Sequence, residues 1–211
     1  ATSVASKYIN LDLDGATAII EGYGNVGEFA AKHLEEAGVK IVGVSDSQGT
    51  IYSSEGIDAK KLLDAKKKTG SVINYKPGKV LKSADLLGID ADIFVTAAIP
   101  DLIKLGDVSK IKAKLIVEGS NIPATVEVEE ALGKKGVMVL PDIIANAGGV
   151  ISSYAEYKGF SVDKMFKLVE EKITSQLKVI LDHSVENQVI PRISSNEIAQ
   201  QRIQDAMDKR K

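Results

Sequence analysis

The chain has 211 residues, of which 44% are apolar and 27% charged, and its formal net charge is −2. This length allows one domain or two small ones, and the composition is too apolar for a disordered protein. The absence of cysteine excludes disulfides and thiolate metal sites, two histidines are too few for a histidine metal site, and the lack of net basic charge argues against a nucleic-acid partner. No apolar run approaches the ~18 residues of a membrane span and no signal peptide is recognisable, so we expect no membrane partner and a cytoplasmic location.

Residues 17–46 form the first recognisable unit. Thr17–Glu21 is a short apolar run typical of a buried strand, and it leads directly into a glycine-rich loop. Apolar residues then recur at helical spacing up to Ala37, and Gly38 is expected to end this helix. Residues 39–45 are typical of a second strand, which ends at Asp46. The unit has the length of a βαβ crossover.

The alternation of strands and helices continues to residue 141. We expect helices at 57–68 and 125–132, closed by Gly70 and Gly133, and one or two helical turns at 83–87. Short strands are expected at 71–75, 91–96, 114–117 and 137–140. This pattern predicts a Rossmann-like, doubly wound, mainly parallel α/β sheet with helices on both faces.

Beyond Asp142 no strand is predicted. Apolar residues at helical spacing predict a long helix over 163–187, with Ser161 near its start. The capping box Ser194-Ser-Asn-Glu197 predicts a last helix that ends in the cations at 209–211. These C-terminal helices are expected to pack on the sheet.

The glycine loop is the strongest functional signal. Gly22-x-Gly24-x-x-Gly27 follows a strand and opens a helix, which is the context in which this spacing binds a dinucleotide. Gly22 permits the tight turn, Gly24 lets the backbone approach a pyrophosphate, and Gly27 lets the helix lie close to the strand. The N–H groups around Asn25 and Val26 then face the phosphates.

Asp46 ends the second strand, near the offset expected for an acid that binds the adenosine ribose. Its carboxylate would repel the 2′-phosphate of NADP, so NAD is the expected cofactor, with Tyr23 and Ser47 as further contacts. NADP stays open, since Gly43 and Ser45 leave room there. The alternative for Asp46 is a structural role in the turn that follows the strand.

Two lysine clusters, at 60–61 and 66–68, are compatible with a phosphate or nucleic-acid patch or with the solvated face of one helix. We favour the solvated face, because the clusters have no aromatic partners and no net basic charge behind them.

Four longer stretches resemble a known family: EGYGNVG at 21–27, VSDSQGTIYSSEGI at 44–57, VEGSNIPAT at 117–125 and LPDIIANAGGV at 140–150. They are similar to the cofactor domain of the glutamate dehydrogenases, within the amino-acid dehydrogenases that include the leucine, valine and phenylalanine enzymes. The resemblance runs over nearly the whole chain. It implies the reversible oxidative deamination of L-glutamate to 2-oxoglutarate and ammonia by hydride transfer to the cofactor.

The resemblance also implies contacts that the pattern alone does not assign. Ala97 and Ala98 match a segment beside the cofactor. Asn121 matches an asparagine near the nicotinamide ribose, Asn146 one in the same site, and Thr2 a threonine near the nicotinamide carboxamide.

Val150 and Ser153 match positions that face the substrate, with the serine hydroxyl meeting the distal carboxylate of glutamate. The catalytic lysine and aspartate of such enzymes belong to a preceding N-terminal domain. Nothing before Thr17 could hold them, so no catalytic residue is expected here. We therefore expect a single dinucleotide-binding domain over 1–211, with a core at about 14–145 and a helical part at about 146–211, which binds cofactor without turnover.

The chain departs from the family pattern at five positions. Thr96 occupies a position where the family usually has proline, Ser120 one where it has alanine and Ser3 one where it has glycine. Ala155 and Tyr157 occupy positions where the glutamate enzymes often have larger aromatic residues. These departures bear on fine contacts rather than on the family.

Residues 153–157 favour the glutamate branch. The cofactor domain of a leucine, valine or phenylalanine dehydrogenase and a stand-alone dinucleotide sensor remain alternatives. The resemblance implies a homo-hexamer for an intact enzyme, whereas this piece alone would be a monomer or weak dimer.

Overall fold

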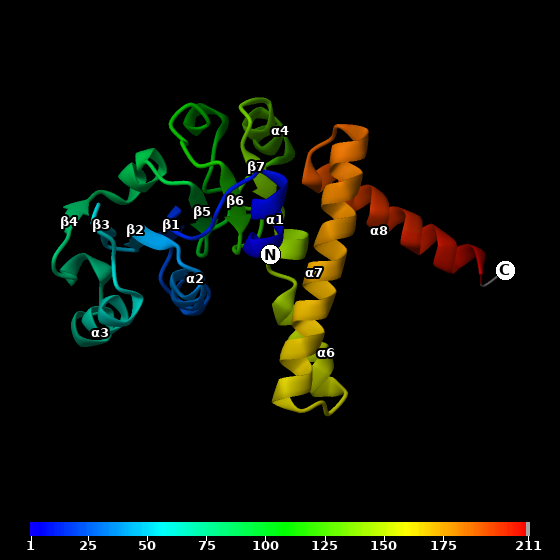
Figure 1. The fold of residues 1–211 in the computed structure, drawn as a ribbon, viewed down its shortest axis with the longest axis horizontal. Coiled ribbons are helices and arrows are strands. Elements are labelled where there is room, and N and C mark those ends of the chain that lie inside the picture. The colour runs from blue at the N-terminus through cyan, green and yellow to red at the C-terminus, as the bar shows by residue number, and fades with distance from the viewer. Residues whose placement is uncertain (210–211) are drawn as a thin grey trace.

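The computed structural model of the protein describes residues 1–209, in which seven strands form one sheet of order β4-β3-β2-β1-β5-β6-β7 (Figure 1). Strands β2, β1, β5, β6 and β7 run parallel, and β3 and β4 are antiparallel to their neighbours. The strands are β1 (Thr17–Glu21), β2 (Lys40–Asp46), β3 (Gly49–Tyr52), β4 (Lys79–Leu81), β5 (Ile93–Thr96), β6 (Leu115–Glu118) and β7 (Met138–Leu140).

Side chains alternate between two cores, one on each face of the sheet. On β1, Ala18 and Ile20 pack into one core, whereas Ile19 packs into the other. The first core lies under α1 (Thr2–Tyr8), α2 (Asn25–Glu36), α3 (Ala59–Thr69) and α7 (Val162–Asn187). The second lies under α4 (Val126–Lys134) and the 3-10 turn η2 (Ser83–Gly88), with η3 (Leu105–Asp107) nearby. The predicted doubly wound α/β fold is confirmed.

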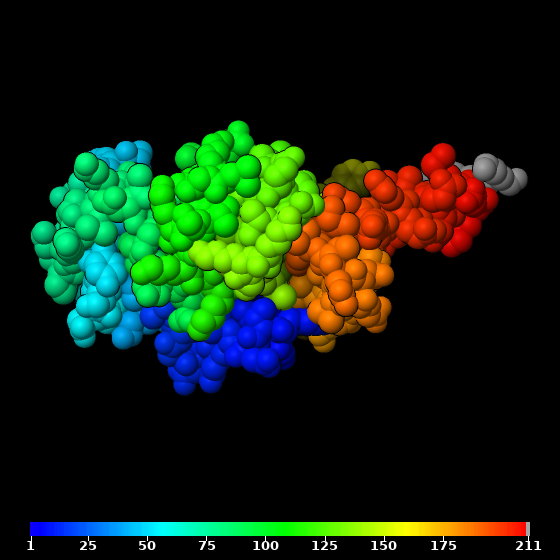
Figure 2. Space-filling model, turned by 90° about the horizontal axis from the view of Figure 1, so that it is seen from above, coloured from blue at the N-terminus to red at the C-terminus, as the bar shows by residue number. Residues whose placement is uncertain are grey.

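The chain after β7 is helical. It comprises α5 (Asp142–Ala145), α6 (Gly148–Tyr157), α7 and α8 (Pro191–Asp208). Ser161 caps α7 by accepting a hydrogen bond from the Lys164 N–H at 3.4 Å, as its position in the sequence predicts. The far half of α8 projects away from the sheet (Figures 1 and 2). Within residues 1–209, no helix is long and apolar enough to cross a membrane.

The predicted strand at 71–75 is wrong. These residues form the 3-10 turn η1 (Val72–Asn74), in which the Ser71 hydroxyl accepts from the Ile73 N–H at 3.4 Å. The two antiparallel strands β3 and β4 are missing from the prediction, because each is only three or four residues long and lies among turn residues.

Two helix boundaries are also wrong. Helix α4 continues through Gly133, where the absence of a side chain lets Ile190 pack closely, rather than ending there. The last helix begins at Pro191, whose fixed φ suits a first helical position, and Ser194 is buried within it rather than capping it. Helices α1, α5 and α6 were not predicted. Of the cations predicted at the C-terminus, Arg210 and Lys211 lie outside the described residues.

Candidate functional site

The sheet changes direction at β1. The chain passes from β1 to β2 on one side and later returns to β5 on the other, so the carboxyl ends of β1 and β5 flank a topological switch point. Ligands of open α/β sheets bind outside such a point. The glycine loop follows β1 and the Ala97–Ala98 segment follows β5, so the sequence places its strongest motif at this crevice.

Two glycines of the loop are required by the chain itself. Gly22 has φ +89°, and an added Cβ would lie 2.6 Å from Ala98 Cβ. At Gly27 an added Cβ would lie 2.0 Å from the Gly22 carbonyl oxygen, so no side chain fits between helix and turn. Gly24 differs, because an added Cβ would meet nothing within 4 Å and its φ is −86°. Packing therefore explains Gly22 and Gly27 but does not explain Gly24.

Helix α2 starts directly at this open space. Gly24 is its N-cap residue, and no side chain caps the helix there. The first N–H groups of a helix have no partner within the helix and carry the positive end of its dipole. The start of α2, at Asn25 and Val26, is thus free to bind an anion.

Glu21, at the end of β1, connects the glycine loop to the segment that follows β5. Its carboxylate accepts hydrogen bonds from the N–H groups of Ala97 at 3.2 Å and Ala98 at 3.0 Å. Burial raises the pKa of Glu21, while these backbone hydrogen bonds oppose the rise. Ala97 and Ala98 are therefore held beside the glycine loop, and their contact with the cofactor stays a prediction.

A cavity of about 630 Å³ opens beside the loop. Among the residues that line it are six of those predicted to bind cofactor, namely Gly22, Tyr23, Gly24, Asp46, Ser47 and Ala98. Its volume is that of a small-molecule site.

Asp46 makes structural contacts at the rim of this cavity. Its carboxylate accepts from the Gln48 N–H at 2.9 Å, the Ser71 hydroxyl at 3.0 Å and the Val72 N–H at 2.8 Å. The turn role considered for Asp46 is thus observed. The same contacts hold the Asp46 carboxylate at the cavity. A turn role and a ribose role are therefore compatible, and the ribose role stays a prediction.

The structure separates one lysine from the cluster at 66–68. Lys66 lines the cavity, donates to the Tyr23 carbonyl oxygen and lies 5.6 Å from the centre of the Tyr23 ring. Sequence reasoning treated this cluster as a solvated face. Only the packing of α3 against the glycine loop distinguishes Lys66 from its neighbours.

The side chains of Asn121 and Asn146 meet beyond the carboxyl end of β6. The Asn146 side-chain amide donates to Asn121 Oδ1 at 2.7 Å, although the residues come from different loops. An added Cβ on Gly119 would lie 3.1 Å from Val26 Cγ1, so this loop runs beside the start of α2. The predicted asparagines therefore form a pair next to the glycine loop.

The other nine predicted residues do not line this cavity, and three of them, Thr2, Val150 and Ser153, belong to other parts of the surface. Thr2 lines a separate hollow with Phe29 and His33 on α2. Val150 and Ser153 lie on α6, where Val150 is 77% exposed and the Ser153 hydroxyl donates to the Gly149 carbonyl oxygen at 3.1 Å. Residues 1–209 contain no group of three or more His, Cys, Asp or Glu side chains that could hold a metal ion.

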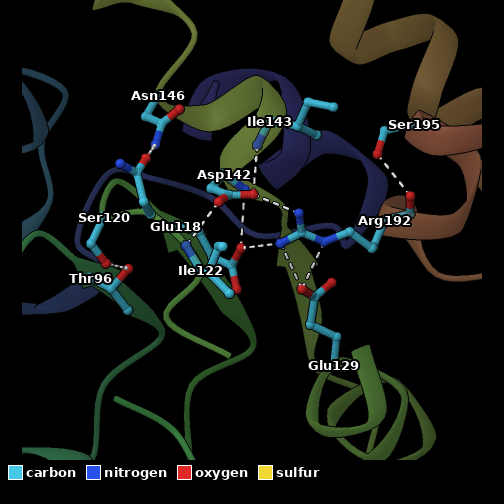
Figure 3. A network of polar contacts seen from close by, with 11 residues as sticks. Thr96, Glu118, Ser120, Ile122, Glu129, Asp142, Ile143, Asn146, Arg192 and Ser195 are labelled. Atoms are coloured by element: carbon cyan, nitrogen blue, oxygen red, sulfur yellow. Dashed lines mark hydrogen bonds and ion pairs between the residues drawn. The ribbon is translucent and has the colours of Figure 1, made fainter. Parts of the chain in front are cut away.

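A buried ion cluster that was not predicted lies next to the asparagine pair (Figure 3). The Arg192 guanidinium donates to Glu118 at 2.7 Å, Glu129 at 2.9 Å and Asp142 at 2.5 Å. The Glu118 and Glu129 side chains are almost fully buried. No sequence signal marks this cluster, because its four residues are far apart in the chain.

Burial, followed by the charge of Glu129, raises the pKa of Glu118 to about 8. The folded protein then holds this proton more tightly than the unfolded chain does. Stability should therefore fall as pH rises from the ordinary range of a glutamate towards 8. We expect Glu118→Gln, which is permanently neutral, to flatten this fall by about 1 kcal/mol or more, measured as the free energy of unfolding in urea between pH 5 and 9. Glu130→Gln, at an exposed glutamate of α4, should keep the wild-type slope, and an unchanged slope in Glu118→Gln would contradict the assignment.

Residues 1–211 match the family model described as glutamate/leucine/phenylalanine/valine dehydrogenase. The NADP-specific glutamate dehydrogenase of Saccharolobus shibatae is 42% identical over 188 residues, which are 86% of this chain and 44% of that protein. The NAD-specific glutamate dehydrogenase of Staphylococcus aureus is 34% identical over an alignment of 212 residues, which covers 98% of this chain and 51% of that protein.

Among solved structures, the Leu-bound hetero-hexameric glutamate dehydrogenase of Thermus thermophilus superimposes with a TM-score of 0.89 at 26% identity. The superimposed part is 99% of this chain and 51% of the Thermus thermophilus chain. The chain spans about half the length of the curated relatives it matches.

Proposed function

The chain belongs to the glutamate/leucine/phenylalanine/valine dehydrogenase family, and from this premise we propose that it is the cofactor-binding part of a glutamate dehydrogenase. The reaction is the reversible oxidative deamination of L-glutamate to 2-oxoglutarate and ammonia. Relatives named as glutamate dehydrogenases support this substrate over an apolar amino acid. The chain spans about half of those relatives, which supports a division in which it binds the cofactor and shares the substrate with an N-terminal catalytic domain.

The cofactor is NAD, with NADP as the alternative. The observation that carries this proposal is the open space at Gly24, which no packing requirement explains and which adjoins the uncapped start of α2. The pyrophosphate would be held there by backbone N–H groups, and the adenosine ribose by Asp46 and Ser47. When bound, the nicotinamide accepts the hydride at C4.

At the nicotinamide end, the proposed contacts come from Ala97, Ala98, Asn121, Asn146 and Thr2. The hydrogen bond between the two asparagines supports their acting together.

Substrate faces α6. Val150 and Ser153 are one helical turn apart and thus share a face of this helix. Ser153 would donate its hydroxyl proton to the distal carboxylate of glutamate. An intact enzyme would assemble as a hexamer in a cytoplasmic setting.

A calorimetric titration of the chain with NAD and NADP tests the cofactor assignment. We expect saturable binding of one dinucleotide per chain and no turnover when glutamate is added. If neither dinucleotide binds, the proposed function is wrong. If the chain alone oxidises glutamate at an ordinary enzymatic rate, the division between two domains is wrong.

Asp46 should decide the choice between the two cofactors. Asp46→Asn removes the charge that would repel a 2′-phosphate while keeping the size of the side chain. We expect the ratio of the NADP and NAD dissociation constants to shift towards NADP by about tenfold, or about 1.4 kcal/mol. Ser71→Ala is the control, because it removes one donor to Asp46 and leaves the charge. A ratio that moves equally in both variants would mean that Asp46 acts only through the turn.

A further inference from the structure

We propose that Arg192 is a positioning residue for the nicotinamide end of the site, acting through Asp142 on the loop that carries Asn121. This inference rests on the proposed function, which places the asparagine pair at the nicotinamide. It adds a residue from α8 that contacts neither asparagine directly.

The connection from Arg192 to the loop consists of short hydrogen bonds. Arg192 donates to Asp142 Oδ1 at 2.5 Å, and Asp142 Oδ2 accepts from the Ile122 N–H at 2.8 Å. Glu118 adds a parallel link, because its Oε2 accepts both from Arg192 at 2.7 Å and from the Asp142 N–H at 3.0 Å. One guanidinium thereby joins the end of β6, the start of α5 and the first turn of α8.

The loop held by these contacts is strained. Ile122 has φ +46°, a conformation that a β-branched side chain rarely adopts. Such a residue keeps this conformation only where its surroundings force it, and strain of this kind collects at functional sites. Its N–H is bound by Asp142, and the preceding residue is Asn121, which accepts from Asn146. The strain therefore sits next to the proposed cofactor contact.

The asparagine pair is attached to the cluster at both ends. Asn146 follows α5, whose first residue is Asp142, and the Asn146 N–H donates to the Asp142 carbonyl oxygen at 3.1 Å. A shift of Asp142 would move both asparagines together. None of the hydrogen bonds of Arg192 reaches the glycine loop or Asp46, so the adenosine end should not respond.

A general role in stability does not require this arrangement. Buried ion clusters are often replaced by apolar side chains with little loss of stability, because desolvation offsets their attraction. What the planar guanidinium provides is a fixed geometry between three carboxylates. Figure 3 shows the Arg192 guanidinium directed at Glu118, Glu129 and Asp142.

The test compares NAD with ADP, which lacks the nicotinamide and its ribose. Arg192→Lys keeps the charge but replaces the fork with a single ammonium that cannot hold three carboxylates. We expect calorimetry to show about a tenfold weaker affinity for NAD and a change within about twofold for ADP. Asn121→Ala should give a similar loss, and adding it to Arg192→Lys should cause little further loss, because both changes remove the same contact. If Arg192→Lys does not fold, Asp142→Asn carries the same expectation.

Lys135→Met is the matched control for general loosening. Lys135 donates to the carbonyl oxygens of Val108 at 2.8 Å and Ser109 at 3.2 Å, at the opposite end of α4 from the asparagines. It should leave the ratio of NAD to ADP affinity unchanged. The inference is overturned if Arg192→Lys leaves this ratio unchanged, if Lys135→Met shifts it equally, or if the two losses add in full. If the wild-type chain binds neither NAD nor ADP, the proposed function itself fails.

Discussion

Replacing Gly24 with valine is expected to abolish detectable dinucleotide binding, a loss of at least about 100-fold or about 2.7 kcal/mol, while the protein stays folded. The backbone at Gly24 has φ −86°, which valine adopts readily, and an added Cβ meets no atom within 4 Å. The valine side chain would instead fill the space next to the start of α2, where the pyrophosphate is proposed to bind. Calorimetric titration with NAD, together with the thermal unfolding midpoint, checks both parts.

A substitution at Gly27, in the same loop, is expected to lower stability rather than to block binding directly. In Gly27→Ala the new Cβ would lie 2.0 Å from the Gly22 carbonyl oxygen, so α2 has to move away from β1. We expect this variant to lose stability, with binding lost only as a consequence. If Gly24→Val binds NAD as tightly as the wild type does, the glycine loop is not the pyrophosphate site.

Arg192→Leu is expected to lower the free energy of unfolding by about 3–5 kcal/mol. The leucine fills much of the space but leaves Glu129 and Asp142 without a cation, beside Glu118, whose raised pKa keeps it largely protonated at pH 7. Removing one partner of a buried ion cluster costs more than the cluster itself contributes, because uncompensated charge remains buried. Urea denaturation at pH 7 measures the loss.

The charge explanation can be checked by removing a carboxylate as well. Adding Glu129→Gln to Arg192→Leu should recover part of the lost stability, because an amide needs no cation. If the double variant is less stable than Arg192→Leu alone, packing rather than charge accounts for the effect.

Features carried by neighbouring residues were predicted correctly. The strand at 17–21, the glycine loop and helix α2 are encoded within one short segment, where apolar spacing and glycine positions act locally. The tight turn at Gly22, with φ +89°, is predicted from the glycine alone, because glycine adopts positive φ without strain. The resemblance singles out Asn121 and Asn146 as site residues, but their pairing, which no local rule predicts, comes from the structure.

Features that depend on distant packing were missed or wrong. Residues 71–75 look like a strand, but Asp46 binds the Ser71 hydroxyl and the Val72 N–H and holds them in a turn. In the sequence Lys66 cannot be distinguished from Lys67 and Lys68. Only the packing of α3 beside the glycine loop places Lys66 at the cavity. The start of α8 was placed at Ser194, because a capping box is a local signal and the burial of that serine is not.

By itself, the sequence determined the alternation of elements, the glycine loop and the family, because all three are properties of contiguous residues. Only the tertiary structure decided that Gly24 opens onto empty space, that Asp46 is bound by a distant turn, and that Arg192 joins three carboxylates beside the asparagine pair. The physical reason is that burial and electrostatic contact depend on which distant segments meet. A carboxylate such as Glu118 therefore acquires its raised pKa only when the sheet and the C-terminal helices enclose it.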